Sequence, residues 1–418
     1  MQERSQKMEK YASRLFWGSE AVDWDERINF ARMREERLTK AKLAMKKNGI
    51  GTCLLARPEN VRYVTSTKAV DYIDQLRYSL AFAEHDPILY EMPPGKLFGG
   101  CPWIKPENLR MGVQWANASC GKDATWKMAK KFAGNVKQDL KEKGLDKEKL
   151  GVDKLDEPAR LALKDAGIET VDAMPVMLDA RAVKTADEIN CLKMAVSIVE
   201  AGWYALYEAL KPGVRDRDMV AVANEALYRA GAEDVWGVLV CSGCPGTGTD
   251  KIVQVGDIVT VDFVRVSYMG YSTCYYRNII VGRRPNDKEK DMHKRCYERI
   301  NRVLDSIKPG ATTADAAKYW QPASERGYPS EEYGWCDDIG HGIGLWLYEY
   351  PIVNRLWSLD FPMTFEKGMT LAVESMHWDP AVGRTKLEEM VVITEKGTEI
   401  ITRMPIKDMM IASPITTA

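Results

Sequence analysis

Histidine is scarce in this chain of 418 residues, which contains four: His85, His293, His341 and His377. The sequence also lacks a G-x-S-x-G segment, so a serine nucleophile on a strained turn is not indicated. The glycine-rich segment GCPGTGTDK lacks the G-K-[ST] ending of a phosphate-binding loop. These absences argue against serine-hydrolase and nucleotide-binding mechanisms and leave few residues for acid–base chemistry.

Neither sign of charge predominates, because 59 Lys and Arg residues face 60 Asp and Glu residues. No basic stripe stands out, which argues against a nucleic-acid surface held by phosphate contacts. No stretch approaches the roughly 18 apolar residues needed to span a bilayer, and the polar start MQERSQKMEK is unlike an export signal. We therefore expect a soluble, cytoplasmic protein that acts on a small molecule, with no nucleic-acid or membrane partner.

The nine cysteines are scattered singly, apart from the pair Cys241 and Cys244 in VCSGCPG. An odd number in a long chain without an export signal predicts reduced thiols rather than a disulfide framework. One C-x-x-C without a second pair is a weak indication of metal or redox chemistry. Buried thiols beside a tight turn are the simpler interpretation of this pair.

The length and a hydrophobic content of 45% predict two domains with separate cores. In the first, helical spacing over 23–49 ends at Gly49, and IGTCLLARPENVRYVTS predicts a buried strand, a turn and a second strand. A third strand over SLAFAEHDPILYEMPPG and helices near 122–144 and 157–166 complete an α/β domain.

The pattern changes near Ala186, after a segment in which Thr185 and Glu188 form a predicted capping box. Two long amphipathic helices over 188–213 and 216–231 precede β-rich segments. A helical pair near 286–327 is followed by more strands, a segregation typical of an α+β domain. We place the domain boundary between 1–182 and 183–418.

Four potential metal ligands occur late in the chain, each in or beside a hydrophobic β-type run: Asp262, His341, Glu374 and Glu388. Any one of the acidic residues taken alone would be expected to face solvent. Together they indicate a shared site, because an ionised carboxylate within an apolar strand is costly unless it is paired or binds a cation. Glycines on both sides of His341 would allow a close backbone approach there.

At these residues the sequence resembles the pita-bread superfamily of creatinase, prolidase and aminopeptidase P. The motifs GDIVTVDFV, GYSTCYYRNIIVG, GHGIGLWLYEYP, GMTLAVES and TKLEEMVVITEKG occur in the superfamily's order, and the resemblance covers about residues 30 to 405. It implies a smaller creatinase-type α/β domain, joined through ARAVKTADEINCLKMA to a C-terminal pita-bread catalytic domain, in a homodimer. The expected fold class is therefore α+β.

Within the superfamily the sequence is most similar to the dimethylsulfoniopropionate lyase branch. The similarity is carried by MREERL, NVRYVTST, RYSLAF, EYPIV, VES and KLEE. The step of 12 residues from Asp262 to Cys274 is one residue longer than is usual in the peptidases and also matches this branch.

The motifs match metal ligands position by position. Asp262 stands at the first metal aspartate, and His341, Glu374 and Glu388 stand at the histidine and the two glutamates. Cys274 replaces the second aspartate. The resemblance therefore implies a metal site of Asp262, Cys274, His341, Glu374 and Glu388.

Three further positions depart from the relatives. Val264 stands where the lyase branch has an additional aspartate, and Tyr348 stands where peptidases keep a substrate-binding histidine. Asp250 lies near the place of another histidine that handles the substrate. These changes argue against amide hydrolysis by the prolidase route, and they leave Asp250, Asp262, His341 and Tyr348 as candidate catalytic residues.

Cys274 allows two interpretations. Its thiolate can replace the aspartate in a centre for zinc or ferrous iron. Alternatively the metal is lost, as in creatinase, and the carboxylates and His341 bind the substrate directly. The loss of one bridging carboxylate argues against two metals, so we expect one divalent metal, with a metal-free site as the alternative.

Aromatic residues are abundant, with 12 Trp and 18 Tyr. Core packing accounts for most of them, but Trp346, Tyr348 and Trp378 are tied to motif positions and suit a cationic substrate group. By the resemblance, the loop TSTKAVDYIDQLRY reaches toward a partner subunit's site, which makes Tyr72 and Arg77 candidate substrate contacts. The alternative is an ordinary loop with a surface arginine.

Three functions remain open from the sequence. The first is a metal-assisted lyase or C–N hydrolase for a small zwitterionic carboxylate of betaine or sulfonio-acid type, in which Asp250, Asp262 or Tyr348 moves a proton. The second is a metal-independent, creatinase-like hydrolase of a guanidino or amide substrate. The third is a catalytically inactive binding module.

Overall fold

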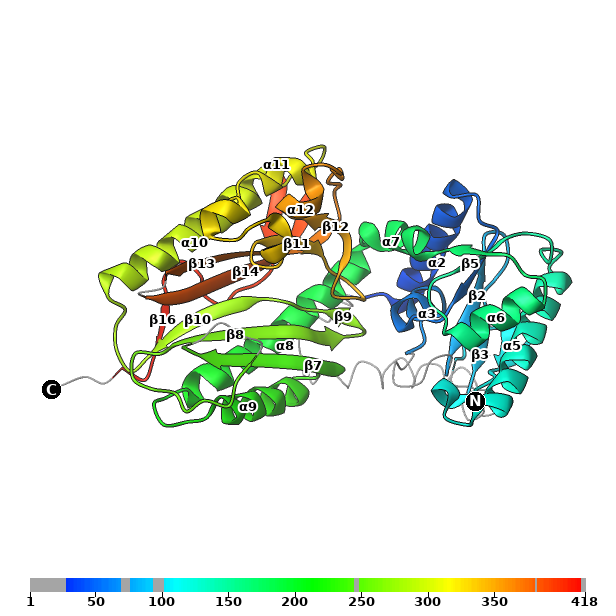
Figure 1. Ribbon diagram of the computed structural model, residues 1–418, viewed down its shortest axis with the longest axis horizontal. Coiled ribbons are helices and arrows are strands. Elements are labelled where there is room, and N and C mark those ends of the chain that lie inside the picture. Colours follow the sequence, from blue (N-terminus) through cyan, green and yellow to red (C-terminus); the bar gives the residue numbers. More distant parts are fainter. Residues whose placement is uncertain (1–27, 69–75, 93–100, 244–247, 380–381, 415–418) are drawn as a thin grey trace, which may run out of the picture.

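The computed structural model describes residues 28–68, 76–92, 101–243, 248–379 and 382–414. Figure 1 shows the N-terminal elements at one end of an elongated molecule and two further sheets with flanking helices at the other. The long helix α8 (Ala186–Ala209) starts at the junction between these two parts and runs along the C-terminal sheets. The expected mixture of helices and sheets in a larger C-terminal and a smaller N-terminal part is confirmed.

The N-terminal part is a six-stranded sheet of order β4-β3-β2-β1-β5-β6. Strand β1 pairs antiparallel with β2 and parallel with β5. The strands are β1 (Thr52–Leu55), β2 (Tyr78–Phe82), β3 (Ile88–Glu91), β4 (Leu109–Met111), β5 (Leu150–Val152) and β6 (Thr170–Asp172). The helices are α2 (Phe30–Lys47), α3 (Pro58–Thr65), α5 (Lys122–Glu142), α6 (Glu157–Asp165) and α7 (Met174–Ala182).

Two sequence predictions for this part are wrong. The segment after β1 is the helix α3, not a second strand, because Pro58 opens its first turn and the β-branched residues after it are buried. The predicted third strand is a hairpin of β2 and β3, interrupted by the polar segment 84–86. The predicted end of the first helix is confirmed, since Gly49 follows α2 with a φ of 66°.

The C-terminal part contains two five-stranded sheets. In the first, of order β16-β10-β8-β7 with β9 paired to β8, the strands are β7 (Asp234–Ser242), β8 (Ile258–Tyr268), β9 (Tyr271–Ser272), β10 (Tyr276–Val281) and β16 (Met410–Ala412). In the second, of order β12-β11-β13-β14-β15, they are β11 (Ile339–Gly342), β12 (Glu349–Val353), β13 (Thr370–Asp379), β14 (Gly383–Thr394) and β15 (Gly397–Ile400). Strands β8 and β10 contact β14, so the two sheets meet.

Helices cover the outer sides of these sheets (Figure 1). α8 and α9 pack against β8 and β7, and α10 packs against β13 and β14. The helices are α8 (Ala186–Ala209), α9 (Asp216–Arg229), α10 (Asp287–Ser306), α11 (Thr313–Ala317) and α12 (Arg355–Ser358). The predicted capping box of Thr185 and Glu188 is confirmed at the start of α8. The second helix of the pair predicted over 286–327 is much shorter than expected, because α11 spans five residues.

The packing between α8, α9 and β8 can be tested at Gly202, with Gly134 in another helix as the control. A Cβ added to Gly202 in α8 would lie 2.8 Å from Leu227 Cδ2 and 2.9 Å from Phe263 Cε1. We expect Gly202→Ala to destabilise the protein by about 1–3 kcal/mol through overpacking. Gly134→Ala in α5, where nothing lies within 4 Å, should instead stabilise it by about 0.5–1 kcal/mol. Urea unfolding of both variants tests the difference, and equal midpoints would contradict it.

Within the described ranges, no helix has the length and apolar character needed to cross a bilayer.

Candidate metal centre

The acidic residues predicted from the motifs lie where the two C-terminal sheets meet. Asp262 is on β8, Glu374 on β13 and Glu388 on β14, and all three are buried. His341 is on β11, and Cys274 lies in the segment between β9 and β10. Residues from five different parts of the chain thus converge on one interior region.

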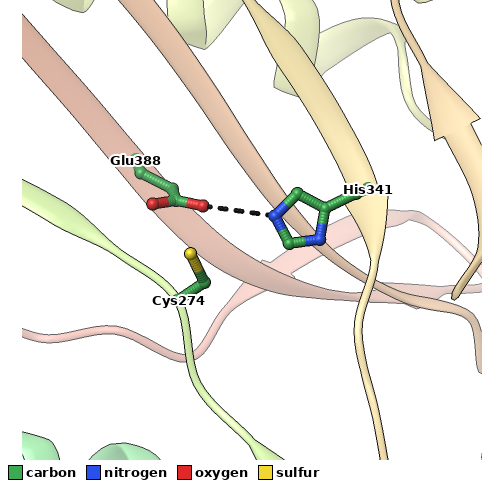
Figure 2. A group of neighbouring side chains, drawn as sticks. All are labelled: Cys274, His341 and Glu388. Carbon is green, nitrogen blue, oxygen red and sulfur yellow. Dashed lines mark ion pairs between the residues drawn. The ribbon is translucent and has the colours of Figure 1, made fainter. Parts of the chain in front are cut away.

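Three of these side chains form a compact group that is shown in Figure 2. Ligand atoms of Cys274, His341 and Glu388 all lie within 4.8 Å of one another. His341 Nε2 is 3.7 Å from Glu388 Oε1, and the sulfur of Cys274 points into the same space. Within the described part of the chain, neither carboxylate oxygen of Glu388 has a hydrogen-bond partner. Because a buried carboxylate without hydrogen-bond partners is costly, this donor set fits a bound cation.

The backbone around His341 fixes the direction of its ring. A Cβ on Gly342 would collide with the carbonyl oxygen of Tyr350, and the β11–β12 register shifts between His341 and Gly342. His341 Nδ1 lies 3.3 Å from the Gly342 carbonyl oxygen. When Nδ1 donates a hydrogen bond to this carbonyl, Nε2 presents its lone pair toward Glu388 and Cys274, as a metal ligand would.

Glu374 and Glu388 face each other directly across β13 and β14. Like charges in that position are unfavourable unless a cation lies between or beside them. Lys386 supplies one, because its Nζ lies 3.1 Å from Glu374 Oε2. Burial raises the pKa of Glu374 to about 7, although the nearby Lys386 acts to lower it.

Lys386 was missed by the sequence reasoning, which considered only candidate ligands. Its position two residues before Glu388 on the same strand was the available signal, because alternate residues of a strand share a face. The side chain is 7% exposed. A lysine buried this deeply requires acidic partners, so its place beside two glutamates could have been inferred from the TKLEE segment.

Cys274 and Asp262 contact each other within this acidic region. The thiol Sγ lies 3.9 Å from Asp262 Oδ1, at the distance of a weak S–H···O hydrogen bond. Burial raises the pKa of Cys274 well above its ordinary value, and Asp262 and Glu388 add to the effect. Burial likewise raises the pKa of Asp262, reinforced by Glu388 and Glu374. So much acidity in one interior region favours a bound cation.

Tyr348 lies at the edge of the centre. Its ring centroid is 4.6 Å from that of His341, yet the residue is 40% exposed, so it connects the buried group to solvent. Burial, with Glu374 as the next cause, raises the pKa of Tyr348, so its hydroxyl is a hydrogen-bond donor. The predicted catalytic role of Tyr348 stays a prediction, and its position at the edge of the centre is compatible with it.

Two residues predicted to handle the substrate are occupied by other partners. Asp250 lies on the loop before β8 and accepts two hydrogen bonds from Arg215, and the Arg215 guanidinium holds its pKa below the usual value. It is therefore poorly suited to act as a base. Arg77 donates to both oxygens of Glu91 at 2.8–3.0 Å, so its guanidinium is not free for a substrate carboxylate within this chain.

The remaining candidates have different outcomes. The guanidinium carbons of Arg57 and Arg265 lie 4.9 and 4.2 Å from the centroid of the Trp346 ring. Two arginines of the same chain therefore occupy the place at this ring that was predicted for a cationic substrate group. Trp378 is 46% exposed near the end of β13, and its role stays a prediction. Cys241 is buried in β7, whereas Tyr72 and Cys244 lie outside the described residues.

The sequence is similar to a family of metallopeptidases and to proteins of known activity. Residues 190–395 match metallopeptidase family M24. The chain is 25% identical over 392 residues to an Xaa-Pro dipeptidase of Pyrococcus furiosus, which covers 88% of this chain and 98% of the relative. It is 27% identical over 401 residues to a dimethylsulfoniopropionate lyase of Roseovarius nubinhibens, covering 90% and 86% of the two chains.

Solved structures give the same fold. An Xaa-Pro dipeptidase from Bacillus anthracis superposes with a TM-score of 0.72 at 24% identity, covering 90% of this chain and 99% of that one. The prolidase from Pyrococcus horikoshii gives a TM-score of 0.68 at 24% identity over 88% and 99% of the two chains. The expected architecture, with a smaller domain before a pita-bread domain, is therefore confirmed. Residues 190–395 therefore form a domain of the metallopeptidase M24 type, and the chain has the pita-bread fold of the proteins it resembles.

Proposed function

We propose that this protein is a metal-assisted enzyme for a small zwitterionic carboxylate, which it cleaves by C–N hydrolysis or by elimination. The observation that carries the proposal is the buried convergence of Cys274, His341 and Glu388, with both oxygens of Glu388 lacking hydrogen-bond partners among the described residues. Retaining these groups in the interior would be costly without a use for them.

The donor set suits one divalent ion, either zinc or ferrous iron. Three protein ligands of sulfur, nitrogen and oxygen type leave a position open for substrate or water, as catalytic zinc sites do. A bound ion would polarise a substrate oxygen and lower the pKa of water or of a neighbouring C–H bond. Asp262 would orient the Cys274 sulfur through their contact, and the Tyr348 hydroxyl would donate a hydrogen bond to a substrate held at the mouth.

The substrate class follows from what the relatives' substrates share. An Xaa-Pro dipeptide and dimethylsulfoniopropionate are both small molecules with a carboxylate and a positive charge. Hydrolysis and elimination are equally compatible with the centre, because both need an activated oxygen or C–H bond beside a bound carboxylate. The homodimer implied by the resemblance belongs to this proposal, and the mass of the protein in solution tests it.

A specific contact favours one alternative, a metal-independent hydrolase. His341 Nε2 and Glu388 Oε1 are 3.7 Å apart, and such a pair can exchange a proton with a substrate directly. An inactive binding module is less well supported, because four acidic or imidazole ligand positions are retained in the interior at an energetic cost.

Removal of metal distinguishes these functions. We expect protein stripped with a chelator to lose turnover and to melt at a lower temperature, with both restored by zinc or ferrous iron, since a ligand at about 100 times its Kd stabilises by about 2.7 kcal/mol. The measurements are metal content, thermal unfolding, and product analysis with Xaa-Pro dipeptides, betaines, sulfonio-acids and guanidino-acids. Turnover that survives complete stripping would favour the metal-independent route, and no turnover with any class would favour the binding module.

A further inference from the structure

Lys386 is a cation built into the acidic centre. Its ammonium group has three N–H donors, and it has two oxygen partners and one aromatic ring nearby. Nζ lies 3.1 Å from Glu374 Oε2, 3.0 Å from the Cys336 carbonyl oxygen and 4.5 Å from the Tyr276 ring centroid. These contacts hold the ammonium group in place beside Glu374.

The strand register determines which acid Lys386 meets. Lys386 and Glu388 occupy the same face of β14, and Glu388 lies directly opposite Glu374 on β13. Glu374 is therefore the diagonal neighbour of Lys386, within reach of a long side chain.

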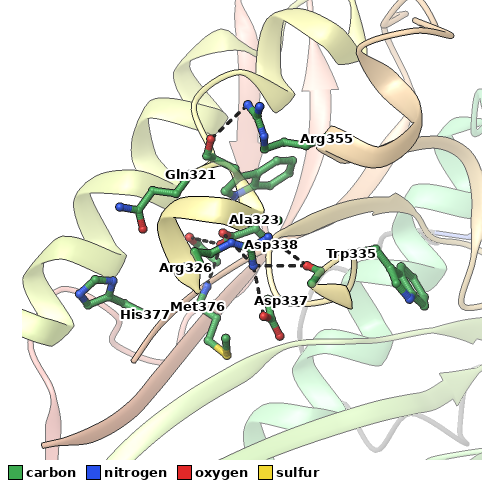
Figure 3. A network of polar contacts seen from close by, with 12 residues as sticks. Gln321, Ala323, Arg326, Trp335, Asp337, Asp338, Arg355, Met376 and His377 are labelled. Carbon is green, nitrogen blue, oxygen red and sulfur yellow. Dashed lines mark hydrogen bonds and ion pairs between the residues drawn. The ribbon is translucent and has the colours of Figure 1, made fainter. Parts of the chain in front are cut away.

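The Cys336 carbonyl, which accepts from Lys386, is followed by Asp337 and Asp338, and Figure 3 shows these two residues in a polar network. The next residue, Asp337, is bound by Arg326 at 3.1 Å. Asp338 Oδ1 accepts a hydrogen bond of 2.9 Å from the Met376 amide on β13, while Arg299 lies 3.6 Å from Asp338 Oδ2. This network ties the segment to β13, so the Cys336 oxygen stays beside Lys386.

We propose that Lys386 occupies one of two cation positions in this centre, binds Glu374, and so limits the centre to a single metal held by Cys274, His341 and Glu388. This inference rests on the proposed function. Two observations support it. Within the described residues, the ligand atoms that converge do not include Glu374. Glu374 instead has the lysine ammonium at ion-pair distance.

The charges of the centre support the same division. Asp262, Glu374 and Glu388 supply three buried carboxylates, which is enough acidity for two cations. The ammonium neutralises Glu374. A single divalent ion would offset the two remaining carboxylates, and the Cys274 thiolate would leave one net negative charge. Without the lysine, Glu374 would become free to bind a second ion.

The test is the metal-to-protein ratio after saturation with zinc and removal of excess by gel filtration, measured by elemental analysis on the full chain. We expect one ion per chain for the wild type and for Lys386→Arg, which keeps the charge. Lys386→Gln should raise the ratio toward two, and the double variant Lys386→Gln/Glu374→Gln, which removes both charges, should return it to one. Circular dichroism confirms that each variant is folded.

Each outcome separates the two proposals. A wild-type ratio of zero would defeat the proposed function itself. A wild-type ratio of two, or a ratio of one in folded Lys386→Gln, would overturn the role of Lys386 and leave the metalloenzyme proposal standing. If Lys386→Gln does not fold, the zinc affinity of Glu374→Gln is the deciding measurement. We expect an affinity within about threefold of the wild type. A loss beyond about tenfold would show that Glu374 is a ligand and would overturn the inference.

Discussion

Replacing Cys274 with serine is expected to lower the affinity for the divalent metal by at least about 100-fold. Removing only the hydrogen-bond partners of a site's ligands costs about 10- to 100-fold, and here a direct ligand is lost. The sulfur lies within 4.8 Å of the other two ligand atoms and is buried with them. A serine hydroxyl is smaller and is not ionised by a single metal as readily as a thiol is. Titration against a chromophoric chelator measures the affinity.

Cobalt substitution gives a second measurement that does not depend on turnover. A thiolate bound to Co²⁺ produces a charge-transfer absorption in the near ultraviolet, which should be present in the wild type and absent in Cys274→Ser. Cys274→Asp restores an acidic oxygen ligand, so it should recover most of the affinity but not the absorption.

The matched control is Cys53→Ser in β1, which removes an equally buried thiol from the other domain. It should leave metal affinity and the cobalt spectrum unchanged. If Cys274→Ser binds cobalt as tightly as the wild type, with the same spectrum, then sulfur is not a ligand and the metal-free interpretation of this position gains support.

The convergence of the ligand positions was predictable from the sequence because each residue lies in a β-type run with a recognisable motif. Apolar residues on both sides of an acidic residue indicate a buried strand. The acidic side chain in such a strand is therefore expected to be buried and to need a partner. Cys274 was included through its position relative to Asp262, not through its residue type. The structure brings its sulfur to the same interior group as His341 and Glu388.

Several features of the structure depend on pairing between residues that the sequence does not connect, so they were not predictable from it. Asp250 binds Arg215, 35 residues earlier, and Arg77 binds Glu91 across a hairpin. Neither pairing leaves a periodic signal in the sequence. The strand predicted in place of α3 has a similar origin, because its β-branched residues suit either element and tertiary burial decides between them.

The junction between the domains contains a buried ion triad that sequence reasoning did not identify. Glu349 on β12 is 2% exposed, with Oε1 at 3.1 Å from Arg181 Nε and Oε2 at 2.9 Å from Lys184 Nζ. Both cations belong to the segment that ends α7 and leads into α8. Burial acts to raise the pKa of Glu349, but Lys184 and Arg181 outweigh it and hold the pKa below its ordinary value.

Glu349→Gln is expected to lower the free energy of unfolding by about 3–5 kcal/mol, because it leaves two buried cations without their acidic partner. Urea unfolding monitored by tryptophan fluorescence measures this loss, with Glu395→Gln at the exposed Lys367 pair as a control that should not move the midpoint. Since the folded-state pKa of Glu349 is depressed, its stabilisation is present above the unfolded pKa of about 4.3 and is lost as the pH falls through the folded pKa. The difference between wild type and variant should therefore shrink at acidic pH, and a difference that stays constant would show that the carboxylate's charge is not what holds the junction.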